Sequence, residues 1–170
     1  YESSKAYESN VYLDLYTNYD DVGNFSLDLK KVNKDGSVLP GSKYDVTVTR
    51  LDGTRLVRRD IEVGDNVEFE GFTVAVGTNI EITEKTAPIG YDVNEYTEIL
   101  TVEAIDELTG DATVKLETGG YENARANIAS KQTLVMSDGS YKTCITLELI
   151  DYETSTFKFG ILAQDATALE

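Results

Sequence analysis

The chain of 170 residues contains no histidine and only one cysteine, Cys144. A single thiol excludes a disulfide within the chain, and the lack of histidine excludes zinc sites built from Cys and His ligands. Catalytic triads that need an imidazole are excluded for the same reason. The sequence also has no calcium loop of the Asp-x-Asp-x-Asp-Gly type. We therefore expect neither a metal centre nor a bound cofactor.

Positive charge is scarce as well. Lys and Arg together number 15 against 31 Asp and Glu residues, which gives a formal net charge of −16. Binding to nucleic-acid phosphates depends on clustered cations, so we expect no nucleic-acid partner. No apolar run approaches the length of a membrane-spanning helix, and we expect no membrane insertion in this segment. Nucleotide-binding loops and paired nucleophile and base motifs are missing too, which argues against an enzyme with external substrates.

The sequence does contain a succession of short segments in which apolar and polar residues alternate. This alternation has the period of a β-strand, and helical periodicity is nearly absent. Turn residues separate the segments, as in Asn33-Lys34-Asp35-Gly36. The pattern predicts an all-β sandwich. The predicted strands lie near residues 10–16, 25–32, 43–50, 55–62, 67–74, 79–84, 95–104, 112–117, 121–129, 132–136, 142–150 and 156–163.

Two of the predicted strands place a charged side chain on their apolar face. Lys31 follows Leu29 at the spacing of alternate residues, and Glu84 follows Ile80 and Ile82 in the same way. An ammonium and a carboxylate in one β core are costly unless they pair, and burial favours the neutral form of each. A neutral amine is a nucleophile, so such a pair could make a covalent bond. The alternative is an ordinary buried ion pair.

Three motifs in a fixed order surround these two residues. Residues 29–36 end a strand with a lysine that is followed two positions later by Asn33. Residues 39–44, Leu-Pro-Gly-Ser-Lys-Tyr, are similar to a Leu-x-Gly-Ala-x-Phe strand entry, and residues 80–91 are similar to Tyr-x-Leu-x-Glu-x-x-Ala-Pro-x-Gly-Tyr. Together they resemble the B-type repeat of collagen adhesins, also called the SpaA or prealbumin-like domain, of Gram-positive surface proteins and pilins. The resemblance covers residues 25–128 and implies an Ig-like or prealbumin-like β-sandwich.

An intramolecular isopeptide bond is what this resemblance implies. In such domains a lysine amine on the first strand attacks the side-chain amide of an asparagine on the last strand. Ammonia leaves, and an acidic residue shuttles the protons. The resemblance gives Lys31 the role of nucleophile and Glu84 the role of proton shuttle. A protein of this kind modifies itself once and is not an enzyme.

The asparagine partner has two candidates. Residues 121–125, Tyr-Glu-Asn-Ala-Arg, resemble the family's terminal pattern and place the aromatic residue and Asn123 on one strand face. Asn127 is the alternative, although Arg125, its neighbour on the same face, is a poor core residue. We predict that Lys31 bonds to Asn123, with Asn127 as the second choice.

The two ends of the chain echo each other. Residues 7–29 and residues 141–161 each contain an alternating strand, an acidic turn with a tyrosine, and a second strand. We therefore predict a central sandwich at residues 23–130, an N-terminal strand segment at residues 1–22 and C-terminal strands at residues 131–170. The terminal strands are expected to form a second, partial β unit.

The resemblance implies a structural stalk or backbone module of a bacterial surface adhesin or pilus. Its place would be extracellular, at the cell surface or cell wall of a Gram-positive bacterium. Its partners would be neighbouring domains or subunits of the same surface protein or filament. Two alternatives remain: a module that itself binds a host protein or glycan, and a filament subunit that assembles by strand exchange.

Overall fold

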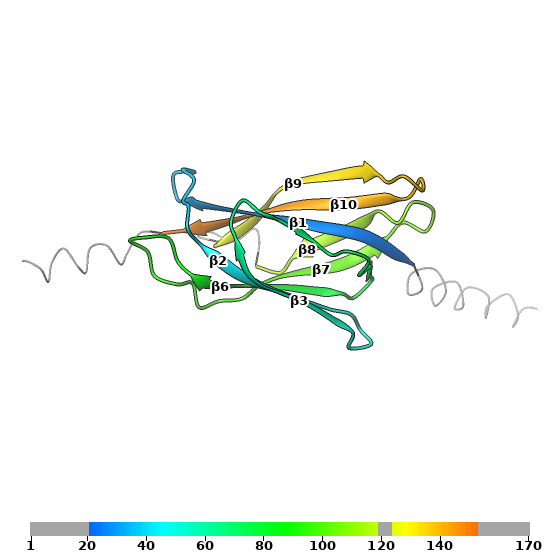
Figure 1. The fold of residues 1–170 in the computed structure, drawn as a ribbon, viewed down its shortest axis with the longest axis horizontal. Coiled ribbons are helices and arrows are strands. Elements are labelled where there is room, and N and C mark those ends of the chain that lie inside the picture. Colours follow the sequence, from blue (N-terminus) through cyan, green and yellow to red (C-terminus); the bar gives the residue numbers. More distant parts are fainter. Residues whose placement is uncertain (1–20, 119–123, 153–170) are drawn as a thin grey trace, which may run out of the picture.

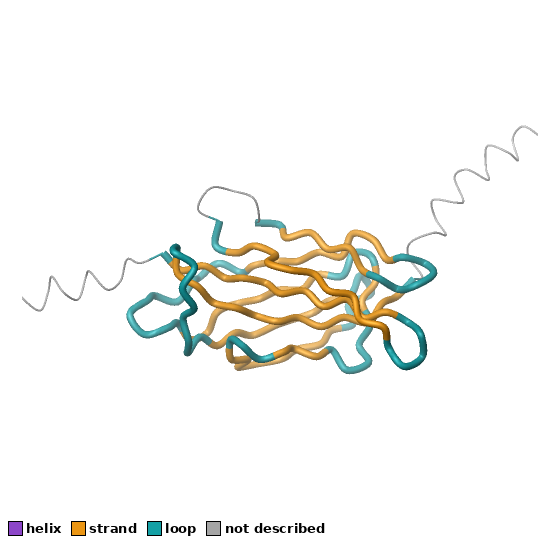
Figure 2. The backbone as a smooth tube through the Cα atoms, turned by 90° about the horizontal axis from the view of Figure 1, so that it is seen from above, coloured by secondary structure: helices purple, strands orange, loops and turns teal. Residues whose placement is uncertain are grey.

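Strands joined by turns and loops make up the part of the chain that the structure describes, which is residues 21–118 and 124–152 of a computed structural model (Figure 2). Within these two ranges no helix is long and apolar enough to cross a membrane. The strands are β1 (Val22–Asn33), β2 (Lys43–Thr49), β3 (Arg55–Glu62), β4 (Asn66–Glu68), β5 (Val74–Ala75), β6 (Asn79–Thr86), β7 (Glu98–Ile105), β8 (Ala112–Leu116), β9 (Ala126–Val135) and β10 (Tyr141–Asp151).

Two sheets pack face to face in a sandwich (Figure 1). One sheet has the strand order β4-β1-β10-β9, and β5 also pairs with β1. The other sheet has the order β3-β2-β6-β7-β8. The all-β sandwich predicted from the alternating pattern is therefore confirmed.

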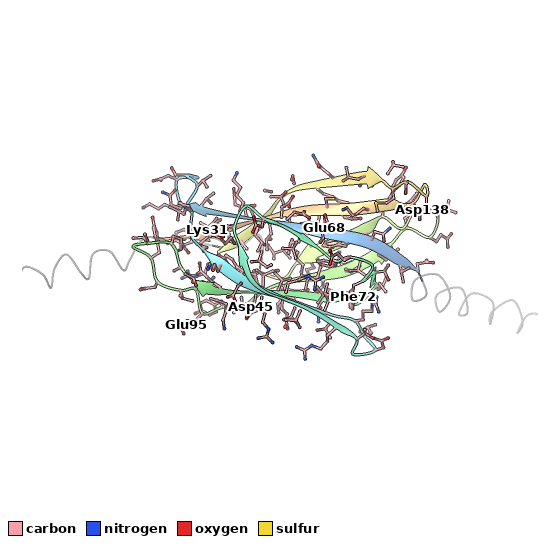
Figure 3. The ribbon with its side chains drawn as sticks, in the orientation of Figure 1. Lys31, Asp45, Glu68, Phe72, Glu95 and Asp138 are labelled. Atoms are coloured by element: carbon pink, nitrogen blue, oxygen red, sulfur yellow. The ribbon has the colours of Figure 1, made fainter. Side chains whose placement is uncertain are left out.

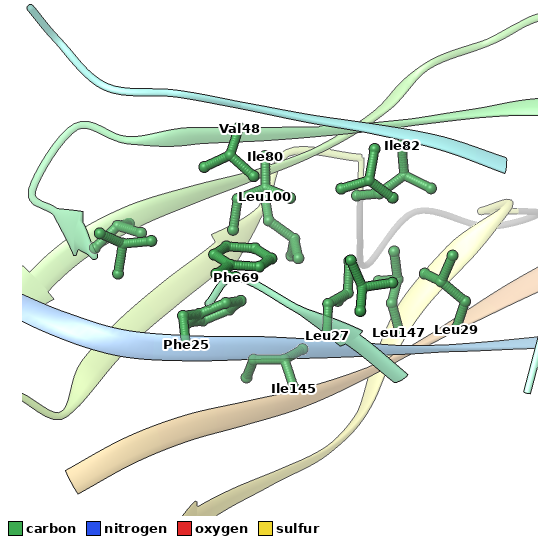
Figure 4. Close-up of a cluster of buried hydrophobic side chains, with 14 of the residues drawn as sticks. Phe25, Leu27, Leu29, Val48, Phe69, Ile80, Ile82, Leu100, Ile145 and Leu147 are labelled. Atoms are coloured by element: carbon green, nitrogen blue, oxygen red, sulfur yellow. The ribbon is translucent and has the colours of Figure 1, made fainter. Parts of the chain in front are cut away.

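Alternate residues of both sheets meet between the layers. Figure 4 shows Phe25, Leu27 and Leu147 of one sheet facing Ile80 and Leu100 of the other. All five side chains belong to the buried core. Burying a large apolar side chain contributes about 1.5 to 3 kcal/mol to the free energy of folding. The burial of this layer is therefore the main interaction that holds the two sheets together.

The first and last described strands are direct neighbours. β1 and β10 pair in parallel, with Asn33 opposite Asp151 at the end of the register. β10 also pairs antiparallel with β9, and β9 runs across the boundary predicted between residues 130 and 131. Residues 131–151 thus belong to the central sandwich, which corrects the predicted division of the chain. The rest of that prediction concerns residues 1–20 and 153–170, which lie outside the described residues.

The physical reason for this correction is the apolar face of β10. Its alternate residues are buried in the common core, and without them one side of the apolar layer would be open to water. β10 also supplies the longest partner of β1, because ten residue pairs lie in register between the two strands. The buried residues of β10 in this core are Ile145, Leu147 and Leu149.

Two other predicted strands differ in extent from those observed. The strand predicted near residues 67–74 is divided into β4 and β5, because Glu70 and Gly71 between them have left-handed φ values of 45° and 86°. The two short strands predicted near residues 121–129 and 132–136 are instead one strand, β9.

The Pro88 motif ends β6 and starts a loop that returns to the interior. β6 stops at Thr86, before a proline that lacks the N–H donor a strand needs. Gly90 has a φ of 92°, a conformation that favours glycine, and the Tyr91 N–H donates to the Pro88 carbonyl at 3.1 Å. Three residues beyond this turn the loop brings Asn94 into the buried interior.

The shared core gives a prediction for the C-terminal strands. Leu147→Ala on β10 is expected to lower the free energy of unfolding of the whole sandwich by about 2 to 5 kcal/mol, because Leu147 is 0% exposed. Leu134→Ala on the neighbouring strand β9 is the matched control, since Leu134 is 46% exposed, and its effect should stay within about 0.5 kcal/mol. Denaturant unfolding followed by tyrosine fluorescence measures both. A separate transition for residues 131–151 would contradict the single core.

Candidate functional site

On three strands of the sandwich, the row of buried apolar residues is followed by a charged residue near the end of the strand. The three charged side chains lie together in the core. Lys31 lies near the end of β1, Glu84 near the end of β6 and Asp151 at the end of β10. Lys31 is 1% exposed, and Glu84 and Asp151 are each 3% exposed. Figure 3 marks Lys31 toward one end of the sandwich, far from Asp138 at the other end. The site is therefore built into the core rather than on the surface.

The two sheets contribute one pair of side chains each. β1 and β10 lie side by side in the first sheet and carry Lys31 and Asp151. In the second sheet Tyr44 of β2 lies directly opposite Glu84 of β6 in the register. Because the sheets face each other, these four side chains converge between the layers.

The Lys31 ammonium is at the centre of the cluster. Its Nζ lies 2.8 Å from Asp151 Oδ1 and 3.2 Å from Glu84 Oε2. It also donates a hydrogen bond of 2.8 Å to the Tyr44 hydroxyl. One buried positive charge therefore faces two carboxyl groups, which leaves an excess of one negative charge if both are ionised.

Hydrogen-bond donors are distributed unequally between the two carboxyl groups. Glu84 Oε1 accepts from the backbone N–H of Asn94 at 2.7 Å, and Glu84 Oε2 accepts from the Tyr44 hydroxyl at 3.3 Å. Asp151 Oδ2 is buried and has no hydrogen-bond partner among the described residues. A buried anionic oxygen without a donor is unfavourable, so this environment favours a proton on Asp151.

Burial of Asp151 also favours its protonated form. It raises the pKa of the Asp151 carboxyl, although the hydrogen bond and the charge of Lys31 act in the opposite direction. Burial also raises the pKa of the Tyr44 hydroxyl, and the nearby charges of Glu84 and Asp151 raise it further. Tyr44 is therefore a neutral hydroxyl that can accept one hydrogen bond and donate another.

This arrangement suits condensation of an amine with a carboxylic acid. The Asp151 carboxyl contains a carbon that an amine can attack, and its Oδ1 is already 2.8 Å from the Lys31 nitrogen. A cavity of about 500 Å³ lies beside the cluster, with Asn94, Arg125, Asp151 and Tyr152 in its wall. Asp151 thus borders a space large enough to hold water molecules.

The structure brings together two of the residues named from the sequence. Lys31 and Glu84 lie in contact, and both point into the core as the alternation predicted. Asn127 does not reach them: it lies on β9, and its side-chain amide donates to Glu148 Oε1 at 3.1 Å. Asn123 lies outside the described residues. The structure also places the carboxyl group of Asp151 beside Lys31, and this residue was not among the predicted partners.

Asp151 is missing from the sequence-based predictions, although a signal for it is present. It follows Leu147 and Leu149 at alternate positions, as Lys31 follows Leu29 in β1. Asp151 was not considered because the expected partner of Lys31 was an asparagine located before residue 130. Tyr44 is missing as well, and its signal is its place on the buried face of β2 with Val46.

Comparisons with known proteins find only distant likeness. No protein-family model matches the chain, and no curated protein matches it. Among solved structures, the pilus adhesin SpaC from Lactobacillus rhamnosus GG in its open conformation has 20% sequence identity and a TM-score of 0.47, over 78% of this chain and 15% of that one. The C-terminal fragment of the same adhesin has 18% identity and a TM-score of 0.41, over 77% of this chain and 45% of the fragment. Values at this level assign no function.

The excess negative charge of the cluster predicts a pH dependence when the lysine is removed. In Lys31→Met the hydrogen bond and the charge by which Lys31 lowers the pKa of Asp151 are lost. Arg125 still lowers this pKa, while burial and Glu84 raise it. An acid with a raised pKa in the folded state binds more protons there than in the unfolded state. The free energy of unfolding should therefore fall as pH rises from about 4, near the ordinary aspartate pKa, to about 8. Between these two pH values we expect the variant to lose about 3 to 5 kcal/mol, which is the usual cost of a buried charge without its partner.

Denaturant unfolding at several pH values measures this effect. Lys30→Met is the matched control, because Lys30 is half-exposed and meets Glu148 at 3.7 Å on the outer face, so its effect should stay within about 1 kcal/mol. The double variant Lys31→Met/Asp151→Asn should lose most of the pH dependence. An equally steep fall in the double variant would show that Asp151 is not its source.

Proposed function

We propose that this chain carries a structural module of a Gram-positive surface adhesin or pilus that is locked by an isopeptide bond between Lys31 and Asp151. The observation that carries the proposal is the 2.8 Å approach of Lys31 Nζ to a buried carboxyl group, with Glu84 within 3.2 Å of the same nitrogen. The three ordered motifs around Lys31 and Glu84 support the same class of protein. In this proposal Asp151 replaces Asn123 and Asn127 as the partner.

The reaction begins with a proton transfer inside the pair. One proton moves from the Lys31 ammonium to the Asp151 carboxylate, which yields a neutral amine and a carboxylic acid. An apolar environment favours this exchange because it removes two opposite charges. The amine nitrogen then attacks Asp151 Cγ and forms the new C–N bond.

Glu84 completes the reaction as a general base and then a general acid. Its carboxylate takes a second proton from the Lys31 nitrogen and returns it to the hydroxyl that leaves Asp151 Cγ. The C–O bond breaks, one water molecule is released, and Glu84 is a carboxylate again. The product is an amide in place of one ammonium and one carboxylate. The protein reacts once with itself and does not turn over an external substrate.

The place of the bond fits a role under tension. The described chain enters the sandwich at the start of β1 and leaves it at the end of β10, and these points lie at opposite ends of the long axis (Figure 1). A bond between Lys31 and Asp151 would carry force from β1 directly to the end of β10. The folded chain between these residues would then be spared from extension.

The bond also adds stability without tension. It closes a loop that spans nearly all of the described domain. The chain-entropy model assigns about 5 kcal/mol to a cross-link over a loop of roughly 100 residues. This is comparable with the total stability of a small domain, which is about 5 to 15 kcal/mol.

Intact mass spectrometry of the denatured protein tests the proposal. The wild type should be lighter than its sequence mass by one water, whereas a bond to an asparagine would remove one ammonia. Lys31→Met and Asp151→Ala should have unreduced masses, and the matched control Lys30→Met should keep the deficit. Glu84→Gln should slow or abolish the reaction. A folded wild-type chain of full mass would contradict the proposal.

One substitution makes the test specific to the partner. Asp151→Asn is expected to form the same amide with loss of ammonia, so that its product has the same mass as the wild-type product. A peptide map of each product should contain the branched pair of peptides around Lys31 and position 151. A branch at Asn123 or Asn127 instead would show that the partner is assigned wrongly.

A further inference from the structure

Tyr44 is the one group of the cluster to which the proposed reaction has so far given no task. Its hydroxyl lies 2.8 Å from Lys31 Nζ, the atom that forms the new bond, and 3.3 Å from Glu84 Oε2. On the buried face of β2 the other residues are Val46 and Val48, so the Tyr44 hydroxyl is the polar group of an otherwise apolar strand face.

The two hydrogen bonds that join Tyr44 to Lys31 and Glu84 run in the same direction, from the lysine toward the glutamate. The Lys31 nitrogen donates to the tyrosine oxygen, and the tyrosine hydroxyl donates to Glu84 Oε2. The proton that must travel from Lys31 to Glu84 thus has a continuous hydrogen-bonded path through one oxygen atom. The direct separation of Lys31 Nζ and Glu84 Oε2 is 3.2 Å, which lies between the lengths of the two steps of this path, 2.8 Å and 3.3 Å.

We propose that Tyr44 is a further catalytic residue of the self-modification, and that its hydroxyl relays the proton from the Lys31 nitrogen to Glu84. The inference rests on the proposed isopeptide reaction. After the amine has attacked Asp151 Cγ, a proton passes from the nitrogen to the tyrosine oxygen while the tyrosine proton passes to Glu84 Oε2. Tyr44 ends the step as a neutral hydroxyl, and Glu84 returns its proton to the leaving hydroxyl of Asp151.

The surroundings of Tyr44 are suited to such a relay. A relay group has to accept and donate at the same time, and only the neutral hydroxyl does both. Burial and the two neighbouring carboxyl groups keep Tyr44 in that form by raising its pKa. Tyr44 also lies opposite Glu84 in the β2–β6 register, so the second step of the path is fixed by strand pairing rather than by a mobile loop.

The test follows bond formation in newly made protein. A labelled chain is synthesised in a short pulse, samples are quenched in strong denaturant at intervals, and the fraction that has lost water is read by mass spectrometry. In Tyr44→Phe we expect the rate to fall by about 10- to 100-fold, while the final extent of reaction stays the same because Glu84 still touches Lys31. Tyr141→Phe is the matched control: it removes the same hydroxyl from a tyrosine at the start of β10, at the other end of the strand from Asp151, and should react at the wild-type rate.

Solvent deuterium separates a relay from a merely structural role. The rate of bond formation is measured in mixtures of H₂O and D₂O and plotted against the deuterium fraction. If two protons move in one step, the wild-type plot should fall and be curved. The Tyr44→Phe chain should show a smaller, linear dependence. Far-UV circular dichroism checks that each variant is folded. If Tyr44→Phe does not fold, the curvature of the wild-type plot still decides the question.

The outcomes distinguish the two proposals. A wild-type chain that never loses water overturns the isopeptide bond and the relay with it. Bond formation in the wild type at a rate equal to that of Tyr44→Phe overturns the relay and leaves the bond. A slower variant with an unchanged isotope effect, or a linear plot for the wild type, also overturns the relay and shows that Tyr44 only positions Lys31.

Discussion

One ammonium group between two carboxyl groups, buried where the two sheets meet, is the constraint on which this end of the sandwich depends. Lys31 lies within 3.2 Å of Glu84 and 2.8 Å of Asp151, away from solvent. Charges in such a place are stable only when each is paired and hydrogen-bonded. The surrounding structure satisfies this demand unevenly, because donors reach both oxygens of Glu84 but only one oxygen of Asp151. In the proposed reaction, that difference makes Glu84 the base and Asp151 the electrophile.

The parallel pairing of β1 with β10 is what makes this cluster possible. Parallel neighbours place their C-terminal ends together, so that Lys31 and Asp151 share one face at one end of the sheet. An antiparallel pairing of the same strands would place them at opposite ends. The same pairing puts the entry and exit of the described chain at opposite ends of the molecule. The geometry that assembles the reactive groups is thus also the geometry in which a cross-link would bear load.

Local pattern was sufficient to predict the sandwich, most of the described strands and the inward direction of Lys31 and Glu84, because the period of two is a property of a single strand. It predicted that Lys31 and Glu84 face the core, and both are confirmed. The identity of neighbouring strands could not be predicted in this way, since it is set by packing between residues far apart in the sequence. The partnership of Lys31 with Asp151, and the shift of register beside Tyr44 that sets it against Glu84, depend on such packing.

The proposed bond resolves the conflict that the fold creates. Before the reaction, the core holds three titratable groups whose charges cannot all be balanced. Condensation removes one positive and one negative charge and leaves Glu84, whose two oxygens already accept hydrogen bonds from Asn94 and Tyr44. In the proposed reaction one oxygen of Asp151 departs as water, so the carboxyl group that has an unsatisfied buried oxygen is the one that is consumed. In this proposal the unfavourable burial of charge favours the condensation, because the condensation removes two of the buried charges.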